Sequence, residues 1–248
     1  MDDTLFRDPP PVTVENADGA SPVVLLCEHV SRFIPAAYGG LGLEEPDLSR
    51  HIAWDIGAAD LARGLSRRLD APLVLGGYSR LLVDCNRPLS SPTLMPTVSE
   101  TTRIPGNENV SEAERARRIA GIFTPFQEAA AALFDARAAR GIRSTVVGVH
   151  TFTPVFDGFV RPWHAGVLYG RAVAFGERLL AALGGPSETI AANEPYRIDG
   201  ADYTIPVHGD ARGLDAVLLE IRNDLVGEPA GVETWADRVA RALLHSVR

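Results

Sequence analysis

Short, nearly continuous runs of apolar residues recur along the chain, and longer stretches with helical spacing separate them. The three clearest runs, each containing β-branched residues, are Val23–Cys27, Ser144–Val149 and Val217–Leu219. Runs of this kind are typical of strands buried on both faces, as in parallel sheets between two layers of helices. Shorter runs at Ala71–Leu75 and Leu81–Asp84 predict two further strands.

The segments between these runs predict helices, weaker strands and one irregular stretch. Apolar residues at helical spacing favour helices over three ranges: Asp47–Leu69, Ala172–Leu183 and Val232–Leu244. A capping box at Ser111–Glu114 opens another helical stretch, which Pro125 is expected to divide and which ends near Gly141. Weaker strand candidates lie at Ala165–Tyr169 and Thr189–Ala192. Ser90–Asn109 lacks periodicity, as in an active-site lid or a surface loop.

This alternation of strands and helices predicts an α/β fold with three layers, in which a mixed, mostly parallel sheet carries helices on both faces. No linker, internal repeat or low-complexity tract divides the 248 residues, so we expect one domain over residues 1–248. No stretch approaches the roughly 18 continuous apolar residues of a membrane helix.

Each of the three clearest apolar runs stops at residues that can bind a metal or move a proton. The first run is followed by Glu28 and His29, the second by His150 and the third by Glu220. In open α/β sheets, ligands bind outside the carboxyl ends of the strands, so these side chains are expected to share one site. Two imidazoles with carboxylates are a common composition for a catalytic zinc site with an adjacent base.

Asp55 lies on the apolar side of the helix predicted for Asp47–Leu69. The stripe at spacings of three and four residues consists of His51, Asp55, Ala58, Ala62, Leu65 and Leu69. A carboxylate on a buried face is costly unless it is paired or bound to a metal. Asp55 is therefore a candidate metal ligand or a partner of one. The alternative is a structural aspartate that holds an arginine or backbone amides.

Several arginines are candidates for binding a substrate carboxylate. Asn86 and Arg87 follow a predicted strand, and a guanidinium beside an amide suits a planar carboxylate. The alternative for this pair is an ordinary turn before Pro88. Arg80, at the start of the same segment, and Arg161 are further candidates, although Arg161 could also pair at the surface.

Glu220 is the candidate general base. A glutamate inside so apolar a run should have a raised pKa, which a base working near neutrality needs. Arg222 is two residues further along the same strand and so points to the same side of the sheet, where it is a candidate for binding substrate. The competing interpretation is a structural ion pair between Glu220 and Arg222.

Composition narrows the choice of partners and compartment. The formal charge is −8 and every one of the 24 cationic side chains is an arginine, which argues against binding nucleic acid through its phosphates. The first ten residues are acidic and proline-rich, unlike a secretory signal, so we expect a cytoplasmic protein with no membrane partner. Cys27 and Cys85 are then expected to be reduced, and zinc binding by Cys27 would lack the usual second cysteine.

Together these segments resemble the N-formylglutamate amidohydrolase family, which is related to the zinc carboxypeptidases and aspartoacylases. The resemblance spans Val23 to Gly231, and its matching segments are Cys27–Ser31 with Ile34–Pro35, Trp54–Asp55, Ser79–Arg80, Asp84–Arg87, His150, Asn193–Tyr196 and Glu220–Leu225. The most specific are Asp-Cys-Asn-Arg-Pro, similar to the Asn-Arg substrate clamp of aspartoacylases, and Glu-Ile-Arg-Asn-Asp, similar to the strand that supplies the carboxypeptidase base.

Two departures make this chain a divergent member. Carboxypeptidases use His-x-x-Glu for two zinc ligands, but Arg32 stands three residues after His29. The second ligand must then come from elsewhere, with Asp55 preferred and Glu28 as the alternative. Glu28 also stands where the N-formylglutamate hydrolases typically have proline.

The resemblance implies a phosphorylase/hydrolase-like fold, as in zinc exopeptidases, and a metal-dependent amidohydrolase. A divalent metal, with Zn²⁺ expected, would be held by His29, Asp55 and His150, and Glu220 would act as the base. The lead substrate is N-formyl-L-glutamate, an intermediate of histidine catabolism, which would give formate and glutamate. The alternatives are the same machinery acting on another N-acyl amino acid or a small peptide, and a metal-free binding protein.

Overall fold

Strands form the centre of the molecule in the computed structural model, which describes residues 5–184 and 189–247. Within these residues the main sheet has seven strands: β1 (Val12–Glu15), β2 (Val23–Cys27), β3 (Leu73–Gly76), β6 (Thr145–Phe152), β9 (Ala165–Leu168), β10 (Ile190–Ala192) and β11 (Ala216–Arg222). Their spatial order is β1-β3-β2-β6-β11-β9-β10. The pairs β1–β3 and β9–β11 are antiparallel and the other neighbours are parallel. The mixed, mostly parallel sheet predicted from the sequence is therefore confirmed.

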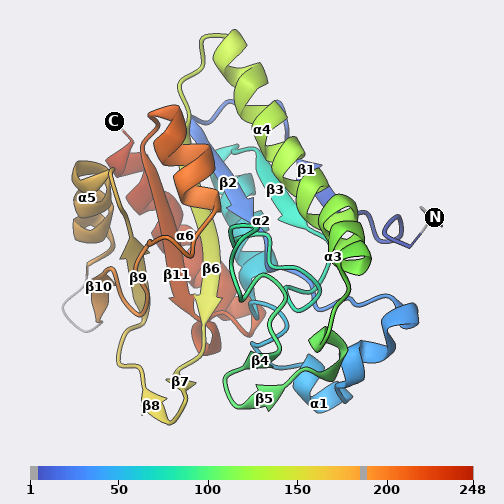
Figure 1. The fold of residues 1–248 in the computed structure, drawn as a ribbon. Coiled ribbons are helices and arrows are strands. Elements are labelled where there is room, and N and C mark those ends of the chain that lie inside the picture. The colour runs from blue at the N-terminus through green and yellow to red at the C-terminus, as the bar shows by residue number, and fades with distance from the viewer. Residues whose placement is uncertain (1–4, 185–188, 248) are drawn as a thin grey trace.

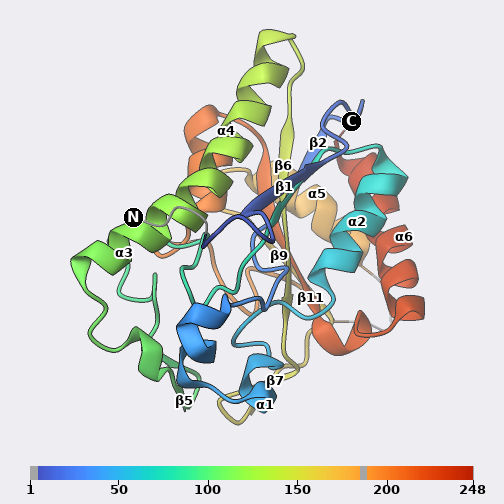
Figure 2. The same cartoon turned by 90° about the vertical axis from the view of Figure 1, so that its right-hand side faces the viewer.

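Helices cover both faces of this sheet, as Figures 1 and 2 show. One layer consists of α2 (Ala58–Leu69), α5 (Val173–Leu183) and α6 (Pro229–Ser246). The other face carries α3 (Glu112–Arg118) and α4 (Thr124–Ala139), joined by a π-helical turn at Ile119–Phe123. Alternate residues of each central strand enter the two cores. In β2, Leu25 and Cys27 pack in the core under α2 and α6, whereas Leu26 packs in the core under α4. Burial on both faces explains why these runs are continuously apolar.

Shorter elements complete the described chain. They are helix α1 (Glu45–Leu48), the hairpins β4–β5 (Val98–Ser99, Thr102–Arg103) and β7–β8 (Val155–Phe156, Phe159–Val160), 3-10 turns at Ala36–Gly42, Pro105–Asn107, Asp210–Arg212 and Asn223–Leu225, and a π turn at Ile205–Gly209. The two hairpins touch, because the Asp157 backbone N–H donates to the Glu100 carboxylate over 3.1 Å. In the described residues, none of the helices combines the length and the apolar character that crossing a membrane requires.

Two of the predicted elements are wrong. The helix expected over Asp47–Leu69 is interrupted: α1 ends at Leu48, turns follow, and α2 begins at Ala58. Gly57, the residue before α2, has a φ of 81°, a left-handed conformation that a helix interior does not allow. Asp55 therefore lies in a turn before α2 instead of on its apolar stripe, yet it is buried as predicted.

The strand expected at Leu81–Asp84 is a buried turn. Leu82 donates its backbone N–H to Ser79 and Asp84 donates to Leu94, so neither pairs with a strand. The side chains of Leu81, Leu82 and Val83 fill the core under α4, which accounts for the apolar run without strand pairing. Burial alone does not distinguish a strand from a packed loop.

The helical stretch after Ser111 begins as predicted and is divided next to Pro125, because α3 ends at Arg118, a π-helical turn follows and α4 begins at Thr124. The Ser111 hydroxyl accepts the Glu114 backbone N–H at 3.2 Å, which is the expected cap. Pro125 lacks the N–H that would bond to the preceding turn, and the π-helical turn at Ile119–Phe123 immediately precedes it. The wide turn accommodates the proline and the helical stretch continues to Ala139.

Candidate metal centre and substrate cavity

A cavity of about 470 Å³ lies at the carboxyl ends of β2, β6 and β11. Most of the sequence candidates line it: His29, Asp55, Arg80, Asn86, Arg87, His150 and Glu220. His150 and Glu220 are direct neighbours across the parallel pair β6–β11. They lie on the same face of the sheet as Val146 and Leu218, which pack in the core under α4. The parallel arrangement thus brings together residues that are far apart in the chain, as expected for this type of sheet.

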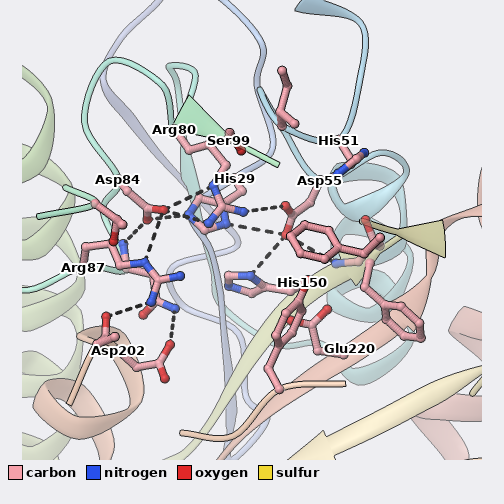
Figure 3. A pocket seen from close by; sticks show the side chains of 18 of the residues that line it. His29, His51, Asp55, Arg80, Asp84, Arg87, Ser99, His150, Asp202 and Glu220 are labelled. Atoms are coloured by element: carbon pink, nitrogen blue, oxygen red, sulfur yellow. Dashed lines mark hydrogen bonds and ion pairs between the residues drawn. The ribbon is translucent and has the colours of Figure 1, made fainter. Parts of the chain in front are cut away.

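His29, Asp55 and His150 meet at one point of this cavity (Figure 3). Each offers one possible ligand atom, and these atoms lie within 4.8 Å of one another. The Asp55 Oδ2 atom lies 3.1 Å from Nδ1 of His150 and 3.6 Å from Nδ1 of His29. Asp55 reaches this position because its backbone N–H donates to the carbonyl of His29, which ties the turn before α2 to the end of β2.

The opposite nitrogen of each imidazole is held by a second carboxylate. Asp84 Oδ1 lies 2.7 Å from His29 Nε2, and Glu28 Oε2 lies 2.8 Å from His150 Nε2. When the carboxylates are ionised, each Nε2 carries the hydrogen and leaves a lone pair on Nδ1. His29 Nδ1 is buried and has no hydrogen-bond partner among the residues that the structure describes. Carboxylate, imidazole and an available ring nitrogen in series are the usual surroundings of a metal-binding histidine.

The charges at this point favour a bound cation. Burial alone would raise the pKa of Asp55, but the adjacent imidazoles hold it well below its usual range. The same opposition lowers the pKa of Glu28 to about 2, with His150 as the main stabilising charge. Burial would lower the pKa of His150, but Glu28 and Asp55 raise it well above the ordinary value. The carboxylates thus stay ionised and attract either protons or a metal to the imidazoles.

Glu220 differs from the other carboxylates in the cavity. It is buried, and its Oε2 atom has no hydrogen-bond partner among the described residues. Burial raises its pKa to about 7, since the nearby positive charges of His150 and Arg80 compensate only in part. The raised pKa agrees with the property expected from its apolar strand. Arg222 is not its partner: Arg222 donates to the Asp224 carboxylate over 2.8 Å and to the Trp163 carbonyl, and does not line the cavity.

The other proposed substrate-binding residues have different surroundings. Arg80 bridges Asp84, at 2.8 Å, and Asp55, at 3.3 Å, so its charge is largely neutralised. The Asn86 amide nitrogen donates to Asp202, and its oxygen accepts from the backbone N–H groups of Tyr203 and Thr204. The side-chain amide is therefore already engaged within the protein.

Arg87 keeps donors for a ligand. It donates from Nη1 to the Ala201 carbonyl over 3.0 Å, and Nη2 has no hydrogen bond within the described chain. Its Nε lies 3.8 Å from Asp84, a longer and weaker ion pair. Arg161 is 5 % exposed and lies behind the cavity lining, against aromatic rings. Of the arginines proposed from the sequence that line the cavity, Arg87 is the one in which a terminal nitrogen makes no hydrogen bond to the described residues.

Sequence reasoning assigned no site role to several residues of this cluster. Asp84 could have been found, because it ends an apolar run just as His150 and Glu220 do. Thr204, whose hydroxyl donates to Glu28, and Tyr196, which lines the cavity, follow no such run. Their positions depend on a loop that returns to the sheet between β10 and β11. Cys27 and Cys85 are buried free thiols, as expected.

Comparison with known proteins identifies the family and the fold of the chain. A family model described as N-formylglutamate amidohydrolase matches residues 21–226. The structure of the gene product Atu2144 from Agrobacterium tumefaciens is 39% identical, with a TM-score of 0.93 over 96% of this chain and 94% of that one. An N-formylglutamate amidohydrolase from Ralstonia eutropha JMP134 has a TM-score of 0.68 at 18% identity, over 96% of this chain and 97% of that one, which shows a shared fold. No curated protein matches the chain.

Proposed function

This chain belongs to the N-formylglutamate amidohydrolase family, and from that premise we propose that it is a metal-dependent hydrolase of a linear amide in an N-acyl amino acid. The lead substrate is N-formyl-L-glutamate, hydrolysed to formate and glutamate. The observation that supports this most directly is the pair of buried imidazoles, each held at Nε2 by a carboxylate and each directing Nδ1 toward Asp55.

His29, Asp55 and His150 are the proposed ligands of a divalent metal, with zinc as the expected ion. Three protein ligands with one open position are typical of catalytic zinc sites. A metal bound there lowers the pKa of a water molecule and polarises the amide carbonyl. The unpartnered Nδ1 atom of His29 supports the assignment, because a buried polar atom without a partner is costly unless something binds it.

Glu28 is then a positioning residue for His150 instead of the second ligand. Its Oε2 atom contacts His150 Nε2, on the side of the ring opposite Asp55, and its other oxygen accepts from Thr204. Asp84 has the same role for His29, and Arg80 holds the Asp84 carboxylate from the far side. Both imidazoles are thus oriented by carboxylates that are themselves held in place.

Glu220 is the proposed general base. In its ionised form it takes a proton from the attacking water and then gives it to the nitrogen of the leaving amine. Its unpartnered Oε2 atom leaves the carboxylate available for both transfers. Arg87, with its donor at Nη2, is the proposed partner of a substrate carboxylate.

The direct test is metal analysis and turnover of the protein purified without chelators. We expect one equivalent of divalent metal and release of formate from N-formyl-L-glutamate, and loss of both in His150→Ala with the fold retained. Full metal occupancy in His150→Ala would contradict the ligand assignment. If the protein hydrolyses only other N-acyl amino acids, one of these compounds is the substrate instead of N-formyl-L-glutamate. A protein with neither metal nor turnover would favour a metal-free binding role.

A further inference from the structure

Arg161 is buried in a box of aromatic rings beside the cavity. Its guanidinium carbon lies 4.6 Å from the ring centre of Phe156, 4.8 Å from that of Tyr196 and 5.7 Å from that of Phe152. Its Nη2 atom donates to the Tyr196 hydroxyl over 2.8 Å, and its Nη1 atom donates to the Thr153 carbonyl over 3.3 Å. Stacking and hydrogen bonds together hold both the arginine and the phenol in one arrangement.

The hydrogen bond between Arg161 and Tyr196 has only one possible direction. A guanidinium donates and never accepts, so the phenol oxygen is the acceptor and its own proton must go elsewhere. Within the described residues, the Tyr196 hydroxyl has no second partner. Tyr196 lines the cavity together with Glu220, and the charge of Glu220 acts on the phenol. Tyr196 is 41 % exposed, so its hydroxyl proton is available to a ligand in the cavity that Glu220 also lines.

The loop that carries Tyr196 is fixed against the sheet. The Glu194 carbonyl passes so close to Gly166 of β9 that a Cβ on that residue would lie 1.7 Å from the carbonyl oxygen. The Asn193 side chain accepts the Tyr169 backbone N–H at 3.0 Å, and the Asn193 backbone N–H donates to Val167. The donor thus belongs to a rigid support, as a group that acts on a reacting atom requires.

We propose that the Tyr196 hydroxyl donates a hydrogen bond to the carbonyl oxygen of the amide that is hydrolysed, and that Arg161 is the positioning residue that directs this proton into the cavity. This rests on the proposed amidohydrolase function. As water adds, the carbonyl oxygen gains negative charge, and a pre-oriented donor stabilises that charge without having to reorganise. The guanidinium on the phenol oxygen also polarises the O–H group and makes it a stronger donor.

The kinetic test is a double-mutant cycle on the metal-loaded enzyme. Tyr196→Phe removes only the hydroxyl, and we expect kcat to fall roughly 10²-fold or more with KM changed by less than about threefold. Arg161→Gln should lower kcat as well. In the double variant, the second change should add little, because the arginine acts through the hydroxyl that is already absent.

Two variants outside the cavity serve as matched controls. Tyr169→Phe removes a phenol hydroxyl from a residue that does not line the cavity. Arg178→Gln removes an arginine that stacks on Phe175 and donates to the Ser246 carbonyl, so it resembles Arg161 in its contacts but not in its position. Both should keep kcat. If Arg161→Gln fails to fold, Arg161→Lys keeps the charge and serves in the cycle.

A binding measurement separates this proposal from the choice of substrate. Acetohydroxamate places an oxygen anion at a metal whatever amide the enzyme cleaves, so Tyr196→Phe should weaken its binding about tenfold or more and Tyr169→Phe should not. If the wild-type protein binds acetohydroxamate but does not hydrolyse N-formyl-L-glutamate, the proposed substrate is wrong. The comparison of acetohydroxamate affinities then still tests the role of the Tyr196 hydroxyl. Unchanged acetohydroxamate affinity in Tyr196→Phe, a change in KM alone, or additive losses in the cycle would each overturn the proposal.

Discussion

At the scale of single residues, the partner of each imidazole nitrogen decides what the neighbouring carboxylates can do. Glu28 and Asp84 contact Nε2 of His150 and His29, whereas Asp55 lies on the Nδ1 side of both rings. Three buried carboxylates around two histidines thus have two separate roles. The distinction follows from which ring atom each carboxylate touches and can be tested residue by residue.

Asp55 and Glu28 should differ in their effect on metal affinity. Asp55→Asn should weaken metal binding about 100-fold or more, because an amide oxygen is a poor substitute for an ionised ligand. Glu28→Gln should stay within about tenfold of the wild type, since the glutamine oxygen can still accept from His150 Nε2. Competition with a chelator of known affinity measures both. The reverse order would assign Glu28 as the ligand and Asp55 as its supporting residue.

Glu220 should set the low-pH limit of activity. A base must be ionised, and the pKa of Glu220 is raised to about 7, so kcat should fall as the pH decreases through that value and level off above it. Glu220→Gln should lower kcat roughly 10²- to 10⁴-fold, keep the metal and lose this limb of the profile. Rates across pH 5 to 9 with metal content determined in parallel provide the check. Near-normal turnover in Glu220→Gln would remove it from the mechanism.

Arg87 should confer the preference for a carboxylate. Charge-assisted hydrogen bonds are worth about 1.5–3 kcal/mol each, so Arg87→Ala should lower kcat/KM roughly 10²-fold or more on N-formyl-L-glutamate. Arg87→Lys should recover only part of this, because lysine offers a point charge without the planar fork. The diamide of the substrate, in which both carboxylates are neutral, is the comparison compound. Equal turnover of diamide and diacid by the wild type would refute both the clamp and the substrate.

At the scale of elements, the turn between α1 and α2 carries a ligand candidate and is shaped by one glycine. Gly57 has a φ of 81°, and a Cβ there would lie 2.4 Å from the Val226 carbonyl oxygen, just beyond β11. The turn therefore depends on a close approach that only glycine permits. Asp55 is two residues away, so the position of its carboxylate depends on the same contact.

Gly57→Ala should lower both thermal stability and metal affinity. Gly213 is the matched control, because its φ of 66° is also left-handed but nothing lies within 4 Å of a Cβ there. Gly213→Ala should show only the backbone strain of about 1–2 kcal/mol. Gly57→Ala should cost more and should displace Asp55 from the metal. Thermal melts and metal titrations of the two variants measure this, and equal metal affinity would separate the turn from the site.

At the scale of the whole molecule, the two hydrophobic cores share the strands that divide them. Leu25 of β2 belongs to one core and Leu26 to the other, and β11 alternates in the same way at Leu218 and Leu219. Neither helical layer can then separate without exposing one face of the central sheet. The proposed metal ligands come from the segment after β2, the turn before α2 and strand β6, and they meet only in the folded state.

The protein should therefore unfold in one cooperative transition whose midpoint depends on metal. A ligand that binds only the folded state raises stability by RT ln(1 + [L]/Kd), about 2.7 kcal/mol at 100 times Kd. Calorimetry with increasing zinc should show one transition that moves to higher temperature, and His150→Ala should remove most of the shift. Two transitions in the metal-free protein would contradict the single domain expected from the sequence.

Local patterns in the sequence determined the central strands, most helices and the edge of the sheet at which the candidate residues gather. Continuous apolar runs at Val23–Cys27 and Val217–Leu219 identified strands, because burial on both faces leaves no polar position to interrupt them. His150 and Glu220 follow or end such runs, and the carboxyl ends of parallel strands meet at one edge. That rule is general to the fold, so it predicted that His150 and Glu220 share one cavity before any contact was known.

Only the tertiary structure decided which contacts these residues make. Leu81–Asp84 is as apolar as a strand but packs as a turn, because pairing depends on neighbours that a local pattern does not contain. Asp55 was found through a helical stripe that in the structure begins only at Ala58, although its burial was correctly inferred. Whether Glu28 or Asp55 faces Nδ1, and that Arg161 turns the Tyr196 proton away from itself, are set by pairs of side chains from distant segments. The direction and length of these hydrogen bonds depend on residues from two different segments, so the local pattern of either segment does not predict them.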